Sequence, residues 1–413
     1  MMLWIKLSLR NAIRNVRRTI LTAATIVVGI AMVVFSLAWI EGIFGDIITS
    51  YTASAGHIRV ADSDFIDREV LQPLYENIVD ANSVRAGILK VPGVVGVEPR
   101  IALGVAVTVG EELGENFAMA IGAEDSYYRD HLKAPELLVK GTWLTGGEHE
   151  VVLGSQIAER IHANLGQELL LLGQTQYGSM SPLTARVVGI VMGDGMLNNQ
   201  VFLPLSEMQW MADLPGGSIE LLVYTEDATP ERVGEVTTNI GKLTEMEGLT
   251  AQPWFLRQPL ATSLPVLQAM KGFLQVLIVF MTALAIFNTM SMSVLERTGE
   301  IGVMRAMGLS RAGAVGLFLV EAIAIGIAGG LGGALLGALP SWYLEVKGMH
   351  LPEDLVRKAG DSLPMKSVIY ANLTPDIVVQ GVLLGLVIAI VGAVLPALRA
   401  ASIQPVSAMS ARR

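Results

Sequence analysis

Long apolar stretches alternate with polar segments along this chain of 413 residues. Each apolar stretch holds about 20 residues or more with almost no charge, which is enough for a helix to cross the hydrocarbon core of a bilayer. The pattern predicts an α-helical membrane protein with four transmembrane helices, the second of them preceded by an amphipathic stalk. Their predicted bounds are 19–44, 267–295 (stalk and helix together), 312–343 and 376–397.

The polar segment between the first two apolar stretches, residues 45–266, has a different pattern. Short runs rich in β-branched residues alternate with helical periodicity, and the segment 150–173 predicts a strand, a helix and a second strand. Further strands are predicted within 94–109 and 218–225. This alternation predicts an α+β domain with a mixed sheet, inserted between transmembrane helices 1 and 2.

The remaining polar segments are short. Residues 1–18 are basic without an acidic residue and predict an amphipathic helix lying on the cytoplasmic membrane surface. Segment 296–311 predicts a short surface helix, 344–375 a short loop and 398–413 a tail. A targeting sequence is the alternative for the first segment, but the apolar run after it is far longer than a signal-peptide core.

Charge is distributed unevenly around these segments. The chain carries −9 in all, and residues 45–266 hold 13 Lys/Arg and 29 Asp/Glu, so that the rest of the chain is positive. Lys and Arg gather on the cytoplasmic side of membrane proteins. We therefore expect both termini and segment 296–311 to be cytoplasmic, and the acidic domain and loop 344–375 to lie on the outer side.

Composition excludes several other classes. With 52% hydrophobic and 16% charged residues, the chain is neither disordered nor an ordinary soluble enzyme. It has no cysteine, and its five histidines lack the spacing of metal ligands. It also lacks the G-x-x-x-x-G-K-[ST] loop that binds ATP phosphates. We expect no cofactor, no metal, no nucleic-acid partner and no catalysis by this chain alone.

The segment ERTGEIGVMRAMGLS, residues 296–310, carries charges of both signs between two apolar stretches. Gly308 suits the end of a helix and Ser310 the start of the next one. The charges of a short helix at a membrane surface are not needed for packing inside the protein. We therefore expect them to be complementary to charges on a partner protein. The candidate coupling residues are Glu296, Arg297, Glu300 and Arg305.

This segment resembles the coupling segment, ERTREIGxxRAxGA, of the FtsX/MacB/LolE superfamily of ABC-transporter permeases, with Gly299 in place of the second Arg. The start LRNAIRNVRRTILTAATIVVGIA, the domain pattern VVLGSQIAERIHANLGQEL…ARVVGIV…NNQVFLPLSEMQ and the tail PALRAASIQPVSAM are similar to the same superfamily. Lipoprotein-releasing permeases of the LolC/LolE type fit best, because their ATPase is a separate subunit.

The resemblance implies a multi-pass protein of the bacterial inner membrane that works with partners. Two copies of a cytoplasmic ATPase subunit would bind ATP and Mg²⁺, and a second permease, identical or homologous, would complete a dimer embedded in membrane lipids. ATP-driven movement inside would reach the periplasmic domain by mechanotransmission and release lipoproteins to a periplasmic carrier.

The alternative is a MacB- or FtsX-like permease without lipid cargo, which drives an efflux adaptor, exports a peptide or regulates a hydrolase. A membrane sensor is disfavoured, because the cytoplasmic segments leave no room for a signalling module.

The polar stretch GQTQYGSMSPLT, residues 173–184, predicts a hairpin tip. In the lipoprotein-releasing permeases a loop at the matching place holds the periplasmic carrier. We expect Tyr177, Met180 and Pro182 to serve as apolar docking residues, and an ordinary exposed hairpin is the alternative.

The first two transmembrane helices are predicted to line a central cavity in a dimer. Their residues near the outer membrane face suit acyl chains better than polar cargo. Ordinary packing or lipid contact is the alternative. The candidate cavity residues are Met32, Phe35, Leu37, Ile40, Leu274, Ile278 and Met281.

The third transmembrane stretch holds one acidic residue, Glu321, inside the pattern FLVEA, which is similar to a FLxEA pattern of the superfamily. Its role is either a structural hydrogen bond or ion pair, or proton chemistry. Glycines of this stretch fall in two rows spaced by four residues, which predicts close helix packing. The rows are Gly326–Gly330 and Gly329–Gly333–Gly337.

Overall fold

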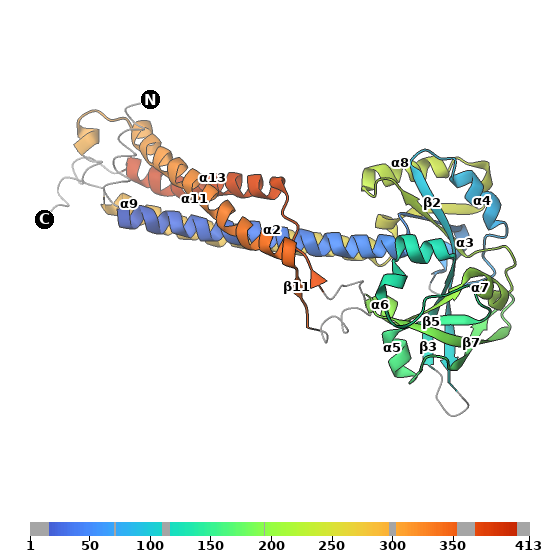
Figure 1. The fold of residues 1–413 in the computed structure, drawn as a ribbon. Coiled ribbons are helices and arrows are strands. Elements are labelled where there is room, and N and C mark those ends of the chain that lie inside the picture. The colour runs from blue at the N-terminus through green and yellow to red at the C-terminus, as the bar shows by residue number, and fades with distance from the viewer. Residues whose placement is uncertain are drawn as a thin grey trace. The chain divides into compact units, whose positions relative to one another are not determined.

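The computed structural model describes residues 16–69, 72–109, 116–193, 195–296, 303–352 and 368–402 (Figure 1). The chain divides into two compact units. The helical unit comprises residues 1–45, 265–349 and 368–413, and the sheet unit comprises residues 46–264 and 350–367. Most of the predicted amphipathic helix at 1–18 and of the tail at 398–413 lies outside the described residues.

Four long helices carry the apolar stretches: α2 (Val16–Ala55), α9 (Leu260–Glu296), α11 (Arg311–Lys347) and α13 (Pro375–Ser402). Each is long and apolar enough to cross a membrane. The helices run on past the ends of the apolar stretches. Helix α2 continues to Ala55 and α11 to Lys347, and each is followed by a glycine with positive φ, Gly56 at +71° and Gly348 at +67°. The chain therefore stays helical until a residue that favours the left-handed conformation ends it.

The glycine rows of α11 pack as predicted. A Cβ atom on Gly333 would lie 2.7 Å from the carbonyl oxygen of Val27, and one on Gly337 would lie 2.5 Å from that of Ala31, both on α2. The other row faces α13, where a Cβ on Gly330 would lie 3.0 Å from the carbonyl oxygen of Val382. The absence of side chains thus lets three backbones approach closely. We call the contact of Gly329, Gly333 and Gly337 with α2 the glycine seam.

The sheet unit is built on one mixed sheet in the order β10-β1-β9-β2-β3-β8-β5-β7-β4, with β6 paired to β2 and β7. The pairs β3–β8 and β5–β7 are parallel and the others antiparallel. The strands are β1 (Ile58–Asp62), β2 (Val94–Thr108), β3 (Asn116–Ala123), β4 (Leu138–Gly141), β5 (Glu150–Gly154), β6 (Glu168–Gln174), β7 (Met180–Val191), β8 (Gln200–Pro204), β9 (Glu220–Thr225) and β10 (Leu249–Pro253). Short strands β11 (Met349–His350) and β12 (Val368–Ile369) pair separately.

Short helices cover this sheet, with α4 and α8 at one end of the unit and α5 at the other (Figure 1). They are α3 (Ser63–Asp67), α4 (Ala81–Ile88), α5 (Ser155–Arg160), α6 (Gly195–Asn198), α7 (Leu205–Ala212) and α8 (Pro230–Ile240). A π-helical turn, η2 (Tyr127–His131), and 3₁₀ turns η3 (Ala134–Leu137), η4 (Thr244–Met246) and η5 (Trp254–Leu256) complete the unit. All six residues of the central strand β9 are buried, as its nearly continuous apolar sequence predicts. The predicted α+β architecture is confirmed.

Candidate functional site: a buried clamp on the end of helix α2

The last turn of α2 lies within the sheet unit and meets two buried tyrosines. The final carbonyl groups of a helix lack partners inside the helix and need donors from elsewhere. The hydroxyl of Tyr224 donates to the carbonyl oxygen of Ala53 at 2.8 Å, and that of Tyr127 donates to the carbonyl oxygen of Ser54 at 2.7 Å. These two hydrogen bonds tie the helix end to β9 and to the η2 turn.

Two guanidinium groups complete the capping of this helix end. Arg100, on β2, donates to the carbonyl oxygen of Ser54, and Arg257 donates through Nη1 to that of Ala55 at 3.3 Å. Cations are favourable at a helix C-terminus, because the helix dipole places partial negative charge there. Both arginines are buried, so this interaction is poorly screened by solvent.

One carboxylate holds both arginines. Glu220, on β9, is only 3% exposed. Its Oε1 accepts hydrogen bonds from Arg100 Nη2 at 2.7 Å and Nε at 2.8 Å, and its Oε2 accepts one from Arg257 Nη2 at 3.2 Å. We call the five side chains that cap α2 or hold its caps the helix-end clamp: Arg100, Tyr127, Glu220, Tyr224 and Arg257.

The charges in the clamp stabilise one another. Burial raises the pKa of Glu220, but the positive charges of Arg100 and Arg257 outweigh burial and lower this pKa to about 2. Burial lowers the pKa of Arg100, and the carboxylate of Glu220 reverses that effect and raises it. Glu220 and Arg100 therefore stay ionised at neutral pH, which removes the cost of an unpaired buried charge.

The clamp also reaches the segment that leads into α9. Arg257 lies shortly before that helix, which begins at Leu260. The hydroxyl of Tyr51, on α2, donates to the backbone oxygen of Gln258 at 3.1 Å. The end of α2 and the entry to α9 are consequently held by the same strand, β9, through the same carboxylate.

Sequence reasoning did not identify the clamp. The signal was present, since Glu220 and Arg100 are charged residues inside otherwise apolar strand patterns, SIELLVYT and PRIALGVAV. A buried charge needs a partner, so each residue predicts an ion pair. The identity of the partners could not be inferred, because the two residues of the pair are 120 positions apart in the chain.

The structure describes part of the predicted coupling segment. Glu296 is the last residue of α9, and Arg297 and Glu300 lie outside the described residues. Arg305 lies in a helical turn at 303–306. Gly308, with φ +102°, ends this turn in a Schellman motif: its amide donates to the carbonyl of Arg305, and the amide of Leu309 donates to that of Met304. Ser310 then caps α11 by accepting a hydrogen bond from the amide of Gly313, as predicted.

The predicted hairpin tip is tighter than the sequence suggested. Strand β6 ends at Gln174 and β7 begins at Met180, and these two residues pair in the ladder. Pro182 lies within β7 opposite Leu172, so neither Met180 nor Pro182 belongs to the turn. Tyr177 is in the turn and its side chain is 76% exposed.

The predicted cavity residues fall into three groups. Leu37 is only 4% exposed and belongs to the apolar core of the helical unit, against which Ile278 packs. Met32, Leu274 and Met281 are exposed. Phe35 and Ile40 are half-buried. The buried residue Leu37 contributes to packing within one chain, while the exposed residues remain accessible to lipid or to a partner.

Glu321 is buried in α11, on the helix that carries the glycine seam. A buried acid at this depth requires a protein environment rather than lipid contact. This position is compatible with the predicted structural role.

Four apolar helices, each able to cross a membrane, and a large α+β unit between the first two of them in sequence define a multi-pass membrane protein with an extramembrane domain. The family model described as "MacB-like periplasmic core domain" matches residues 19–240, and the one described as "FtsX-like permease C-terminal" matches residues 272–405. The chain therefore belongs to the FtsX/MacB/LolE superfamily of ABC-transporter permeases.

Curated relatives come from several branches of this superfamily. The chain is 27% identical to "Lipoprotein-releasing system transmembrane protein LolC" of Xylella fastidiosa (strain 9a5c), in an alignment covering 64% of this chain and 66% of the relative, just under two thirds of its length. It is 23% identical to LolC of Haemophilus influenzae over 95% of this chain and 93% of the relative. It is 24% identical to "Macrolide export ATP-binding/permease protein MacB 2" of Aeromonas hydrophila over 84% of this chain and 54% of that protein.

Solved structures with local similarity include the periplasmic region of MacB from Actinobacillus actinomycetemcomitans, with 16% identity, coverage of 49% of this chain and 91% of that chain, and a TM-score of 0.36. Another is the extracellular domain of the noncanonic ABC-type transporter YknZ from Gram-positive bacteria, with 15% identity, coverage of 47% and 98%, and a TM-score of 0.34.

Proposed function

We propose that this chain is the permease subunit of an ABC transporter of the bacterial inner membrane, and that it transmits movement from cytoplasmic ATPase subunits to its periplasmic domain. The observation that carries this proposal is the helix-end clamp. Buried ion pairs and hydrogen bonds hold the end of α2 and the entry to α9 to a single central strand. In this proposal, movement of the last turn of α2 and of the segment before α9 reaches the sheet through these contacts, all of which lie within the sheet unit.

Two ATPase subunits and a second permease complete the transporter complex. The charged segment around Arg305 is the contact for the ATPase, and both chain termini lie on the same cytoplasmic side. The Schellman motif at Gly308 and the cap at Ser310 support a defined helical turn at this contact, rather than an irregular loop. ATP and Mg²⁺ belong to the ATPase subunit.

The cargo best supported is a lipoprotein that passes from the membrane to a periplasmic carrier. Relatives named LolC support this class of cargo. The exposed apolar residues Met32, Leu274 and Met281 are suitable contacts for acyl chains. Tyr177, exposed in its tight turn, is the docking residue for the carrier.

The second candidate is a MacB-like permease without lipid cargo. The comparable identity to a MacB protein favours it, as does the short β6–β7 turn, which leaves only Tyr177 of the three predicted docking residues at the tip. Its periplasmic partner would be an efflux adaptor or a hydrolase instead of a lipoprotein carrier.

The experiment is to express the chain together with a candidate ABC ATPase subunit and to place a photocrosslinking amino acid at Tyr177. Capture of a lipoprotein carrier, with acylated protein retained in the purified complex, is the expected result. The same crosslinker at the exposed residue Thr238, on α8, is the control. Capture of an adaptor or hydrolase without acylated cargo would favour the second candidate. Both candidate functions would be contradicted if the ATPase does not bind this chain and its activity is unchanged by Arg305→Glu.

A further inference from the structure

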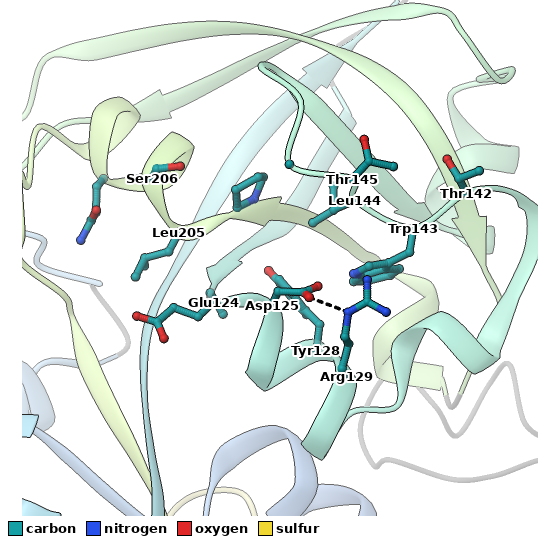
Figure 2. A pocket seen from close by; sticks show the side chains of 14 residues that line it. Glu124, Asp125, Tyr128, Arg129, Thr142, Trp143, Leu144, Thr145, Leu205 and Ser206 are labelled. Atoms are coloured by element: carbon teal, nitrogen blue, oxygen red, sulfur yellow. Dashed lines mark hydrogen bonds and ion pairs between the residues drawn. The ribbon is translucent and has the colours of Figure 1, made fainter.

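A cleft of about 730 Å³ lies in the sheet unit, apart from the helix-end clamp. Figure 2 shows its side chains, which come from the η2 turn and the residues just before it, the segment after β4 and the start of α7. Its apolar lining comprises Tyr128, Trp143, Leu144 and Leu205. Behind it, Phe202 packs edge-on against Tyr128 at 6.0 Å between ring centroids. The cleft has the volume usual for small-molecule sites, which is roughly 300–1,000 Å³.

Trp143 brings an unused hydrogen-bond donor to this lining. Its side chain is only 6% exposed, and its indole Nε1 is buried without a hydrogen-bond partner among the described residues. A buried donor left unpaired is costly, and buried indole N–H groups usually have a partner. The neighbouring hydroxyl of Tyr128 is not available, because it donates within the protein to backbone oxygens of Ile121 and Leu203. Trp143 Nε1 is therefore an unsatisfied buried donor beside the cleft, next to aromatic rings and to the hydroxyl-bearing residues Thr142 and Ser206.

The charged residues at the rim are already neutralised. Glu124 pairs with Arg85 at 2.9 Å, and Asp125 pairs with Arg129 at 2.5 Å (Figure 2 draws the second pair). These pairs leave no net charge to attract an ion. The recognition chemistry is consequently apolar contact plus hydrogen bonds to an uncharged polar group.

From this arrangement we propose that the cleft binds an uncharged, largely apolar molecule that carries a carbonyl oxygen, and that Trp143 Nε1 donates to that oxygen. Flat or ring-containing molecules stack against the aromatic lining, and the paired rim charges give no net attraction to carboxylates or amines. The site does not depend on ATP or on the identity of the transported cargo, so it can be tested on the permease alone.

The test uses benzophenone, an uncharged aromatic ketone that labels nearby C–H bonds on illumination, with the full-length permease in detergent. Mass spectrometry of peptides then locates the label. We expect saturable labelling of peptides that contain residues 142–146 or 204–209. Fluorenone should protect them at about a tenfold lower concentration than fluorene, which has the same ring system but no oxygen, because one hydrogen bond contributes about that factor.

Three variants sharpen the test. Trp143→Phe should make fluorenone and fluorene equally effective. Ser206→Trp, at an exposed rim position, should reduce cleft labelling to background even if the first variant folds poorly. Trp210→Phe, which makes the same change at an exposed position of α7, should behave as wild type.

Several outcomes would overturn the proposal. They are labelling of the cleft that does not saturate, equal protection by both competitors in the wild type, and labelling that persists in Ser206→Trp. Non-saturable labelling would mean that the cleft holds no specific binding site.

Discussion

The helix-end clamp and the glycine seam both fix α2, but they do so by opposite means. At the clamp, the helix end meets buried charges and hydroxyl groups that satisfy its final carbonyls. At the seam, in the helical unit, α2 meets glycines whose missing side chains let α11 approach its backbone. One contact relies on charge and direction, and the other relies on shape.

The difference follows from what each part of the helix lacks. Inside an apolar stretch every backbone group is bonded within the helix, and surrounding lipid is as apolar as the side chains, so close packing is the main source of attraction. At a helix end the carbonyls are unsatisfied, and donors there contribute directly. The clamp should therefore be sensitive to loss of charge and the seam to added volume.

The largest effect is expected from Glu220→Ala. The change leaves Arg100 and Arg257 buried without their carboxylate, which costs about 3–5 kcal/mol in comparable sites. Urea unfolding of the full chain in detergent, followed by near-UV circular dichroism, measures the loss. Glu124→Ala is the matched control, because its ion pair with Arg85 is partly exposed and should contribute about 1 kcal/mol or less. Equal losses in the two variants would contradict the importance of burial.

Next in size is a dependence on pH. The folded-state pKa of Glu220, about 2, lies below its ordinary value of 4.5. The stabilisation is therefore fully present above the unfolded-state pKa and is lost as pH falls from about 4.5 towards 2. Its size is on the order of 3 kcal/mol. The free energy of unfolding of wild type should decline across this range more steeply than that of Glu220→Gln. Parallel curves would mean that Glu220 is not the titrating group.

At the seam, Gly337→Ala should destabilise the helical unit by about 1–3 kcal/mol, since the added methyl meets the backbone of α2. Thermal unfolding in detergent measures this loss. Gly316, on the same helix, has open space around its Cα. Gly316→Ala should accordingly be neutral or stabilising, because alanine favours helix over glycine. A similar loss in both variants would indicate that the seam is not close-packed.

The smallest effect is expected from Tyr224→Phe. It removes the hydrogen bond to Ala53 and keeps the ring, which stacks on His131 at 3.4 Å between centroids. A loss of about 1 kcal/mol is expected for one neutral hydrogen bond. Tyr177→Phe, in the exposed turn, should cause no loss. If Tyr224→Phe also unfolds like wild type, the hydroxyl of Tyr224 does not contribute to the clamp.

The seam was predictable from the sequence and the clamp was not, for a physical reason. Glycines spaced by four residues on one helix reveal a packing face without knowledge of its partner. The clamp depends on the pairing of β9 with β2 and on where α2 ends, and both are set by contacts between distant parts of the chain. Hydropathy placed the four helices, but their ends were set by Gly56 and Gly348 rather than by the limits of the apolar runs.

The candidate sites also divide into features that local sequence predicts and features that tertiary contacts decide. Local patterns correctly predicted the turn at Gly308 and the cap at Ser310. They did not reveal that Leu37 is buried or that Met180 pairs within a strand, because burial and ladder register are tertiary properties. The cleft at Trp143 was missed for the same reason, since its lining comes from segments about 80 positions apart.

Distance measurements in the complex can show directly whether movement driven by the ATPase reaches the sheet unit through the clamp. The chain has no cysteine, so Thr238→Cys on α8 gives one spin label per sheet unit in a complex with the ATPase. Electron–electron distances between the two labels are recorded with and without trapped ATP, for wild type, Arg257→Met and the control Arg85→Met. We expect a nucleotide-dependent shift in wild type. Arg257→Met should lose this shift while ATP hydrolysis continues, and Arg85→Met should leave the shift unchanged. A full shift in Arg257→Met would contradict transmission through the clamp.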